Sequence, residues 1–193
     1  MKIQVFSDLH VDVYPIKPIT IVPGVDLVIV AGDVCEGVLR AFEHLRRIVP
    51  MDIPIVMALG NHEFYRKFIP DELALAISHA GAFHLHVLNG TAFEQSGVRF
   101  VGATLWTDYR IMGEANQARV MSACAKGMND HRLIGWQKKP WLRFRPQEAA
   151  LLHTGQRPPS PRCSRRRLPG RPWWLAITRC IGTRSIPGFA AIS

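Results

Sequence analysis

Residues 26–33 read DLVIVAGD, a nearly continuous apolar run that ends in a glycine and an aspartate. An apolar run without alternation is typical of a strand that is covered on both faces, as in a parallel sheet. Similar segments flank it along the chain: residues 2–6 alternate and end before SDLH, and residues 54–59 (PIVMAL) end before GNHE. These segments predict a sheet whose strands each end in a polar loop.

Helical patterns alternate with these strand segments. Between the second and third segments, four apolar residues recur on one face of a helical pattern: Val38, Phe42, Leu45 and Val49. Asp71 can cap a second helix that runs to about Ala80. Further strands are expected at residues 84–88, 92–95 and 98–104. The alternation predicts an α/β fold built of layers.

Polar residues that suit a metal follow each of the three strong strands: Asp8, His10, Asp33, Asn61 and His62. The carboxyl ends of strands in an open α/β sheet form the crevice where ligands bind, so we expect these side chains to converge. Carboxylate, imidazole and amide oxygen together suit a divalent transition metal, and a carboxylate can bridge two ions. Gly32 and Gly60 would let the backbone turn where a side chain could obstruct the metal. The set predicts a two-metal hydrolytic site.

In order along the chain, D-x-H, G-D and G-N-H-E resemble the signature of the calcineurin-like metallophosphoesterase family. The resemblance continues through VGATLWTDY (residues 101–109) and through Asn129 and Asp130, so that it covers roughly residues 1–153. It implies a layered β-sandwich flanked by helices. It also implies hydrolysis of phosphomonoesters or phosphodiesters, and hence a phosphate-ester substrate.

The same resemblance implies a role for each residue of the polar set. Asp8 and His10 would bind the first of two divalent metal ions, which would be Mn, Fe or Zn. Asp33 would bridge the two ions and Asn61 would bind the second, so that the ions activate water and hold the phosphoryl oxygens during in-line attack. His62 would be the catalytic histidine, which stabilises the developing charge or protonates the leaving oxygen.

Complete members of the family supply further histidines from a T-H-H and a G-H-x-H motif, and neither motif occurs in this sequence. Residues 175–189 (LAITRCIGTRSIPGF) resemble the strand and loop that carry T-H-H, with Arg179 and Cys180 where the histidines would stand. The second ion would then keep only Asp33 and Asn61. The resemblance therefore predicts a sandwich that is incomplete at its C-terminal end, and impaired activity.

The net charge of +9 is concentrated at one end of the chain. Residues 154–193 contain eight arginines and no acidic residue, whereas residues 1–153 hold 16 basic and 15 acidic residues. We predict the N-terminal part of a metallophosphoesterase domain over residues 1–153 and an aberrant Arg/Pro-rich tail over residues 154–193. The alternative is a catalytically inactive scaffold, or a protein that binds nucleic acid through the tail with Trp173 and Trp174 as stacking platforms.

Two further features bear on the compartment. No apolar run reaches the roughly 18 residues that a bilayer-spanning helix needs, and the N-terminus enters a strand pattern at once instead of a leader. The four cysteines include no C-x-x-C pair, so reduced thiols are expected. The sequence thus predicts a cytoplasmic protein with no membrane partner.

Some residues close to the motifs are open to a structural interpretation. Glu63 and Asp12 are interpreted as helix caps or solvated charges rather than ligands. Trp106 and Tyr109 either line a substrate pocket or belong to the core. A small buried side chain explains Cys35 as well as metal ligation does.

Overall fold

The computed structural model describes residues 1–14, 18–156 and 173–178. Its central sheet has four parallel strands in the order β1-β2-β3-β4: β1 (Ile3–Phe6), β2 (Leu27–Val30), β3 (Ile55–Ala58) and β4 (Leu85–Leu88). Every residue of β2 and β3 is buried. This burial explains why the sequence of both strands is apolar without alternation.

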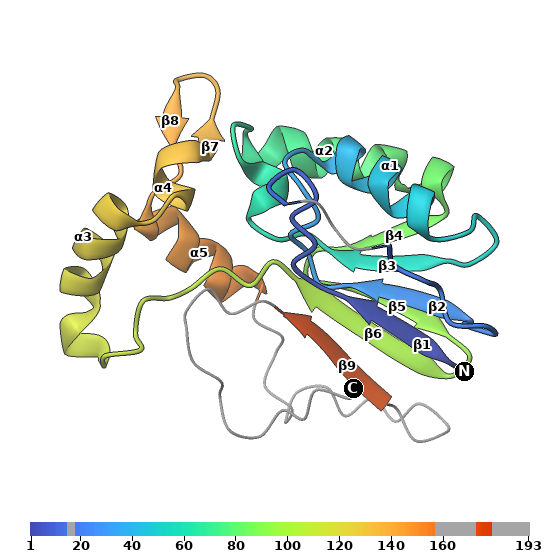
Figure 1. Cartoon of the computed structure of the whole chain (residues 1–193). Helices are drawn as coiled ribbons and strands as arrows, with labels where there is room; N and C mark the ends of the chain where they lie inside the picture. The colour runs from blue at the N-terminus through green and yellow to red at the C-terminus, as the bar shows by residue number, and fades with distance from the viewer. Residues whose placement is uncertain (15–17, 157–172, 179–193) are drawn as a thin grey trace.

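Two helices cover one face of this sheet, α1 (Val38–Ile48) and α2 (Ile69–His79) (Figure 1). Helix α1 buries the apolar face that its sequence predicted, including Val38, Phe42 and Leu45. Helix α2 begins at Ile69, three residues before the start that a cap at Asp71 would give, with a proline in its first turn, so Asp71 lies in that turn and does not cap the helix. A carboxylate there still interacts favourably with the positive end of the helix dipole.

A second sheet covers the opposite face of the first (Figure 1). It has the order β5-β6-β9, with β5 (Thr91–Gln95) antiparallel and β9 (Trp173–Thr178) parallel to β6 (Val98–Ala103). Phe100 of β6 is fully buried in one cluster with Ile29 and Val56 of the first sheet. The result is the predicted β-sandwich flanked by helices, built around one core between sheet and helices and another between the two sheets.

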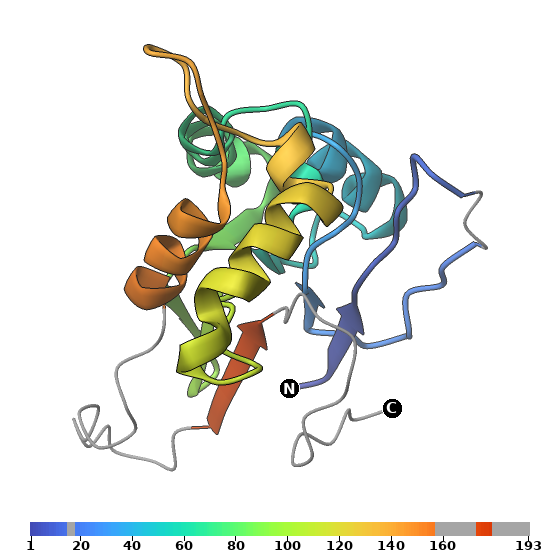
Figure 2. The same cartoon turned by 90° about the vertical axis from the view of Figure 1, so that its left-hand side faces the viewer.

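The remaining elements lie beside the sheets (Figure 1). They are helices α3 (Gln117–Gly127), α4 (Asp130–Leu133) and α5 (Pro146–Gln156), and strands β7 (Gly135–Gln137) and β8 (Leu142–Arg143). Helices α3 and α5 lie side by side (Figure 2). Short 3-10 helices span His62–Phe64 (η1), Ala80–Phe83 (η2) and Glu114–Asn116 (η3). None of the described helices is long and apolar enough to cross a bilayer.

The predicted tail falls only in part within the described residues. Strand β9 belongs to residues 154–193, and helix α5 continues past residue 153 to Gln156. The remainder of the tail, including Arg179 and Cys180, lies outside the described residues. The division of the chain at residue 153 and nucleic-acid binding by the tail therefore stay predictions.

Candidate metal centre

Three loops meet at one end of the parallel sheet, and each follows one of the strands β1, β2 and β3. Backbone hydrogen bonds join the first loop to the second: the Asp8 amide donates to the Gly32 carbonyl at 3.2 Å and the His10 amide to the Asp33 carbonyl at 3.0 Å. All five residues predicted for the site lie on these loops. The convergence expected for the carboxyl ends of parallel strands is thus present.

The backbone of the first two loops is unusual at the residues assigned as ligands. Asp8, His10 and Asp33 have φ angles of 55°, 44° and 58°. Non-glycine residues in this left-handed region cost about 1–3 kcal/mol each and persist where the surroundings over-determine them. Such positions concentrate at functional sites, where a strained backbone conformation can be part of how a side chain is oriented.

The centre of the site is a group of potential ligand atoms from His10, Asp33 and His62, all within 4.8 Å of one another. His10 Nδ1 lies 3.3 Å from His62 Nδ1, and His10 Nε2 lies 3.9 Å from Asp33 Oδ2. Asp33 is fully buried. Two imidazoles around a buried carboxylate fit a divalent transition metal.

The other two predicted ligands border this group. Asp8 Oδ1 lies 3.7 Å from His10 Nε2, and its side chain is 46% exposed. Asn61 is buried and directly precedes His62 on the third loop. His62, predicted as the catalytic histidine, lies near enough to the other two groups to bind metal itself. The structure therefore places all five residues on three loops at one end of the parallel sheet.

Gly32 and Gly60 are required for different reasons. Gly32 has a φ of +79°, and a Cβ there would lie 2.4 Å from the Gly60 nitrogen. A Cβ on Gly60 would lie 1.8 Å from Asp33 Oδ1. Gly60 therefore leaves room for the buried carboxylate, whereas Gly32 supplies both the left-handed turn and the close approach of the two loops.

Glu63 is the main residue of the site that the sequence interpretation missed. It is fully buried and not a solvated charge. Its carboxylate accepts hydrogen bonds from the amides of Gly60 (2.6 Å), Asp33 (3.1 Å) and Val34 (2.7 Å). Burial raises the pKa of Glu63 to about 7, although these backbone hydrogen bonds act in the opposite direction. One side chain thus ties the second loop to the third.

Asn61 is held by two partners that the sequence did not reveal. Its amide nitrogen donates to the Tyr65 hydroxyl and to Asp130 Oδ1, each at 2.8 Å. Burial, together with the charge of Asp130, raises the pKa of Tyr65, so its phenol stays protonated. The third loop is therefore anchored to α4, which carries Asp130 at its start.

The charge state of His62 follows from its surroundings. Burial, and after it the neighbouring His10 imidazole, lower the pKa of His62. Both causes disfavour a positive charge on the ring. The neutral imidazole that results at neutral pH can bind metal or donate one hydrogen bond.

Three of the residues left open by the sequence, Trp106, Tyr109 and Cys35, belong to the core. Trp106 and Tyr109 are each only 2% exposed, and the Trp106 ring packs edge-on against Phe144 with the centroids 4.5 Å apart. Cys35 is buried, and burial is the main cause that raises the pKa of its thiol to about 12. Asp12 has a local role, because its carboxylate accepts a hydrogen bond from the Glu36 amide at 2.9 Å.

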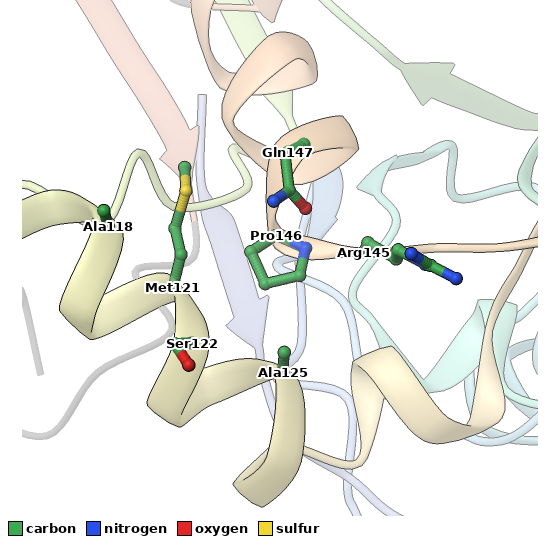
Figure 3. A pocket seen from close by; sticks show the side chains of 7 residues that line it. All are labelled: Ala118, Met121, Ser122, Ala125, Arg145, Pro146 and Gln147. Atoms are coloured by element: carbon green, nitrogen blue, oxygen red, sulfur yellow. The ribbon is translucent and has the colours of Figure 1, made fainter.

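A cavity of about 330 Å³ lies between α3 and the start of α5 (Figure 3). Its lining consists of four residues of α3 and three at the start of α5: Ala118, Met121, Ser122, Ala125, Arg145, Pro146 and Gln147. None of the predicted site residues contributes to it. The cavity is thus separate from the candidate metal centre.

Comparison with known proteins gives the family. Residues 1–156 match the calcineurin-like phosphoesterase family. No curated protein matches the chain. Among solved structures, the chain resembles the phosphopantetheinyl hydrolase from Mycobacterium tuberculosis with a TM-score of 0.62 and 19% identity, over 92% of this chain and 67% of that one. This likeness shows a shared fold. Because the family match covers most of the sequence and agrees with the motifs, the chain belongs to the calcineurin-like phosphoesterases and is a hydrolase of that class.

Proposed function

We propose that this chain hydrolyses phosphomonoesters or phosphodiesters with two divalent metal ions, Mn, Fe or Zn, at the ends of β1, β2 and β3. The observation that carries the proposal is the group formed by His10, Asp33 and His62, whose ligand atoms lie within 4.8 Å of one another. The metal ions would activate water for attack and neutralise charge on the phosphoryl oxygens.

Each ligand has a role in this proposal. Asp8 and His10 would hold the first ion, Asp33 would contribute its carboxylate to both ions, and Asn61 would hold the second. The second ion has fewer protein ligands than the first, because no T-H-H or G-H-x-H motif supplies more. We therefore expect the chain to bind two ions in two steps, with the second step weaker than the first.

His62 acts on the substrate in this proposal. Its lowered pKa favours the neutral ring, which donates a hydrogen bond to the oxygen that gains charge as the P–O bond breaks. Hydrogen-bond donation requires no proton transfer at the start of the reaction, so a lowered pKa does not disable the residue.

The test compares Asp33→Ala with Asp71→Ala, a change at an exposed carboxylate of α2. Metal content is measured on the purified proteins after Mn²⁺ loading, together with hydrolysis of p-nitrophenyl phosphate and of bis(p-nitrophenyl) phosphate. We expect Asp33→Ala to lose metal and Mn²⁺-dependent activity, and Asp71→Ala to keep both. Equal metal content in the wild type and in Asp33→Ala would overturn the proposal.

His62→Ala separates the two roles of that side chain. As a catalytic residue its loss should lower kcat by about 10²–10⁴-fold while the protein still binds Mn²⁺ as tightly as the wild type. A parallel loss of Mn²⁺ binding would instead assign His62 to the metal, and the catalytic assignment would be wrong.

A further inference from the structure

Asn61, Tyr65 and Asp130 form a closed triangle of hydrogen bonds beside the candidate metal centre. The Asn61 nitrogen lies 2.8 Å from the Tyr65 hydroxyl and 2.8 Å from Asp130 Oδ1, and the Tyr65 hydroxyl lies 3.0 Å from the same Oδ1. All three side chains are buried. Polar groups that are buried together are held firmly, because an unmade bond there costs about 1–3 kcal/mol.

The donors and acceptors of this triangle allow one orientation of the Asn61 amide. A carboxylate accepts and does not donate, so Asp130 must face the amide NH₂ group. The Tyr65 hydroxyl gives its single hydrogen to Asp130 and accepts from Asn61. Rotating the amide by half a turn would place its carbonyl oxygen 2.8 Å from a carboxylate oxygen and leave two acceptors facing each other.

Hydrogen bonds that fix the position of the Asn61 amide nitrogen also fix the position of its carbonyl oxygen. An amide carries its oxygen and nitrogen on opposite sides of one planar group, and only the oxygen binds a cation. Whether Asn61 can bind a metal ion therefore depends on which end of its amide the neighbouring side chains bind. Outer partners of this kind orient ligands in many metal sites, and their loss typically weakens metal binding by about 10–100-fold.

We propose that Asp130 and Tyr65 are positioning residues, which bind the nitrogen end of Asn61 so that its carbonyl oxygen serves the second metal ion. The inference rests on the proposed function, because it assumes that Asn61 is a ligand. It gives the α4 segment a part in the site, since Asp130 stands 69 residues after Asn61 in the chain.

The experiment is a double-mutant cycle read by Mn²⁺ titration calorimetry. Asp130→Asn offers a donor as well as an acceptor, so Asn61 can turn, and the second Mn²⁺ should bind about 10–100-fold more weakly. Asn61→Asp sets two buried carboxylates against each other and should also weaken it. In the double variant Asn61→Asp/Asp130→Asn, the new amide donates to the new carboxylate, which still offers an oxygen to the metal. We expect the second-ion affinity to recover to within a few-fold of the wild type.

Two further variants complete the set. Tyr65→Phe removes one of the two acceptors of the Asn61 amide and should weaken the second ion less than Asp130→Asn does. Asp71→Asn makes the same chemical change at an exposed position and should alter neither step. Melting temperatures of all metal-free variants separate loss of folding from loss of binding. A purely structural role for Asp130 would lower the melting temperature without restoring the second ion in the double variant.

Asn61→Ala distinguishes this inference from the proposed function. If Asn61→Ala binds Mn²⁺ like the wild type, Asn61 is not a ligand, and the ligand assignment fails together with the inference. If Asn61→Ala weakens the second ion but neither Asp130→Asn nor Tyr65→Phe does, the proposed function stands and the positioning role is wrong. A double variant no tighter than the weaker single variant also overturns the positioning role.

Discussion

The central sheet and the helical segment, residues 105–156, differ in how deeply their side chains are buried. Strands β2 and β3 are buried along their whole length, whereas α3 has no buried residue. Ile29 in the sheet is 1% exposed, and Ile111 before α3 is 83% exposed. The contacts between the helical segment and the site region include the hydrogen bond from Asn61 to Asp130 and the ring contact of Trp106 with Phe64, whose centroids lie 6.0 Å apart.

This difference shows why the candidate ligands lie at the ends of the sheet strands. Strained backbone at Asp8, His10 and Asp33 can persist only where neighbouring groups leave no alternative. The dense sheet, the two facing glycines and the Glu63 carboxylate provide that constraint. The helical segment contributes Asp130, whose carboxylate accepts a hydrogen bond from Asn61.

The largest effect should come from Gly60→Ala, which tests how tightly the sheet loops are packed. A Cβ there would lie 1.8 Å from Asp33 Oδ1, so the carboxylate must move. We expect Mn²⁺ binding to weaken on the order of 100-fold or more. The matched change in the helical segment is Gly155→Ala in α5, where a Cβ meets nothing within 4 Å. That variant should bind Mn²⁺ normally, and unaltered binding in both would contradict the comparison.

The same truncation in the two regions gives the next effect. Ile29→Ala leaves a cavity in the dense core and should lower the free energy of unfolding by about 2–5 kcal/mol. Ile111→Ala removes a side chain that is already 83% exposed, so its effect should stay within about 0.5 kcal/mol. Urea unfolding of the metal-free proteins measures both. Similar losses of unfolding free energy in Ile29→Ala and Ile111→Ala would contradict the difference in burial between the two regions.

Arg46 at the end of α1 tests a polar connection within the sheet region. Its guanidinium donates to carbonyls of the turn after α1 and of the segment before β4: Val49, Pro50, Ile53, Phe83 and His84. Arg46→Met leaves these acceptors unsatisfied and should cost about 2–3 kcal/mol. The neighbouring Arg47 is exposed, so Arg47→Met is the control and should be nearly neutral. Equal thermal stability of the two variants would remove Arg46 from the account of this region.

A pH-dependent effect should arise inside the helical segment at His131, whose ring nitrogens lie 2.7 Å from the Tyr109 hydroxyl and 3.2 Å from the Phe144 carbonyl. Burial lowers the pKa of His131 below the 6.5 of the unfolded chain. The unfolded chain therefore takes up a proton first as the pH falls, and stability is lost from about pH 6.5 down to the folded pKa, by at most about 1.4 kcal/mol per pH unit. His131→Gln should flatten this part of the profile.

Urea unfolding of the metal-free protein between pH 5 and 8 measures the effect. His62 and His86 also have lowered pKa values, so the difference between wild type and variant isolates His131. A variant with the slope of the wild type would show that His131 does not contribute.

The elements of the sheet could be predicted from the sequence because their signals are local. Apolar runs and alternation placed β1 to β6 within one or two residues, and the helical spacing placed the buried face of α1. The same locality placed the candidate ligands, since each directly follows a strand and parallel strands end at a common edge. The family match agrees with the predicted fold class, whereas the roles of the individual ligands stay predictions.

What the sequence left open depends on contacts between distant segments. Glu63 resembles a solvated charge in the sequence, and only the packing of two loops around it shows that its carboxylate accepts three backbone hydrogen bonds. The partnership of Asp130 with Asn61 joins residues 69 positions apart, and the assignment of Trp106 to the core requires Phe144 as its neighbour. Local sequence patterns do not predict such pairs, because the surroundings of a side chain are set by the elements that pack against it once the chain has folded.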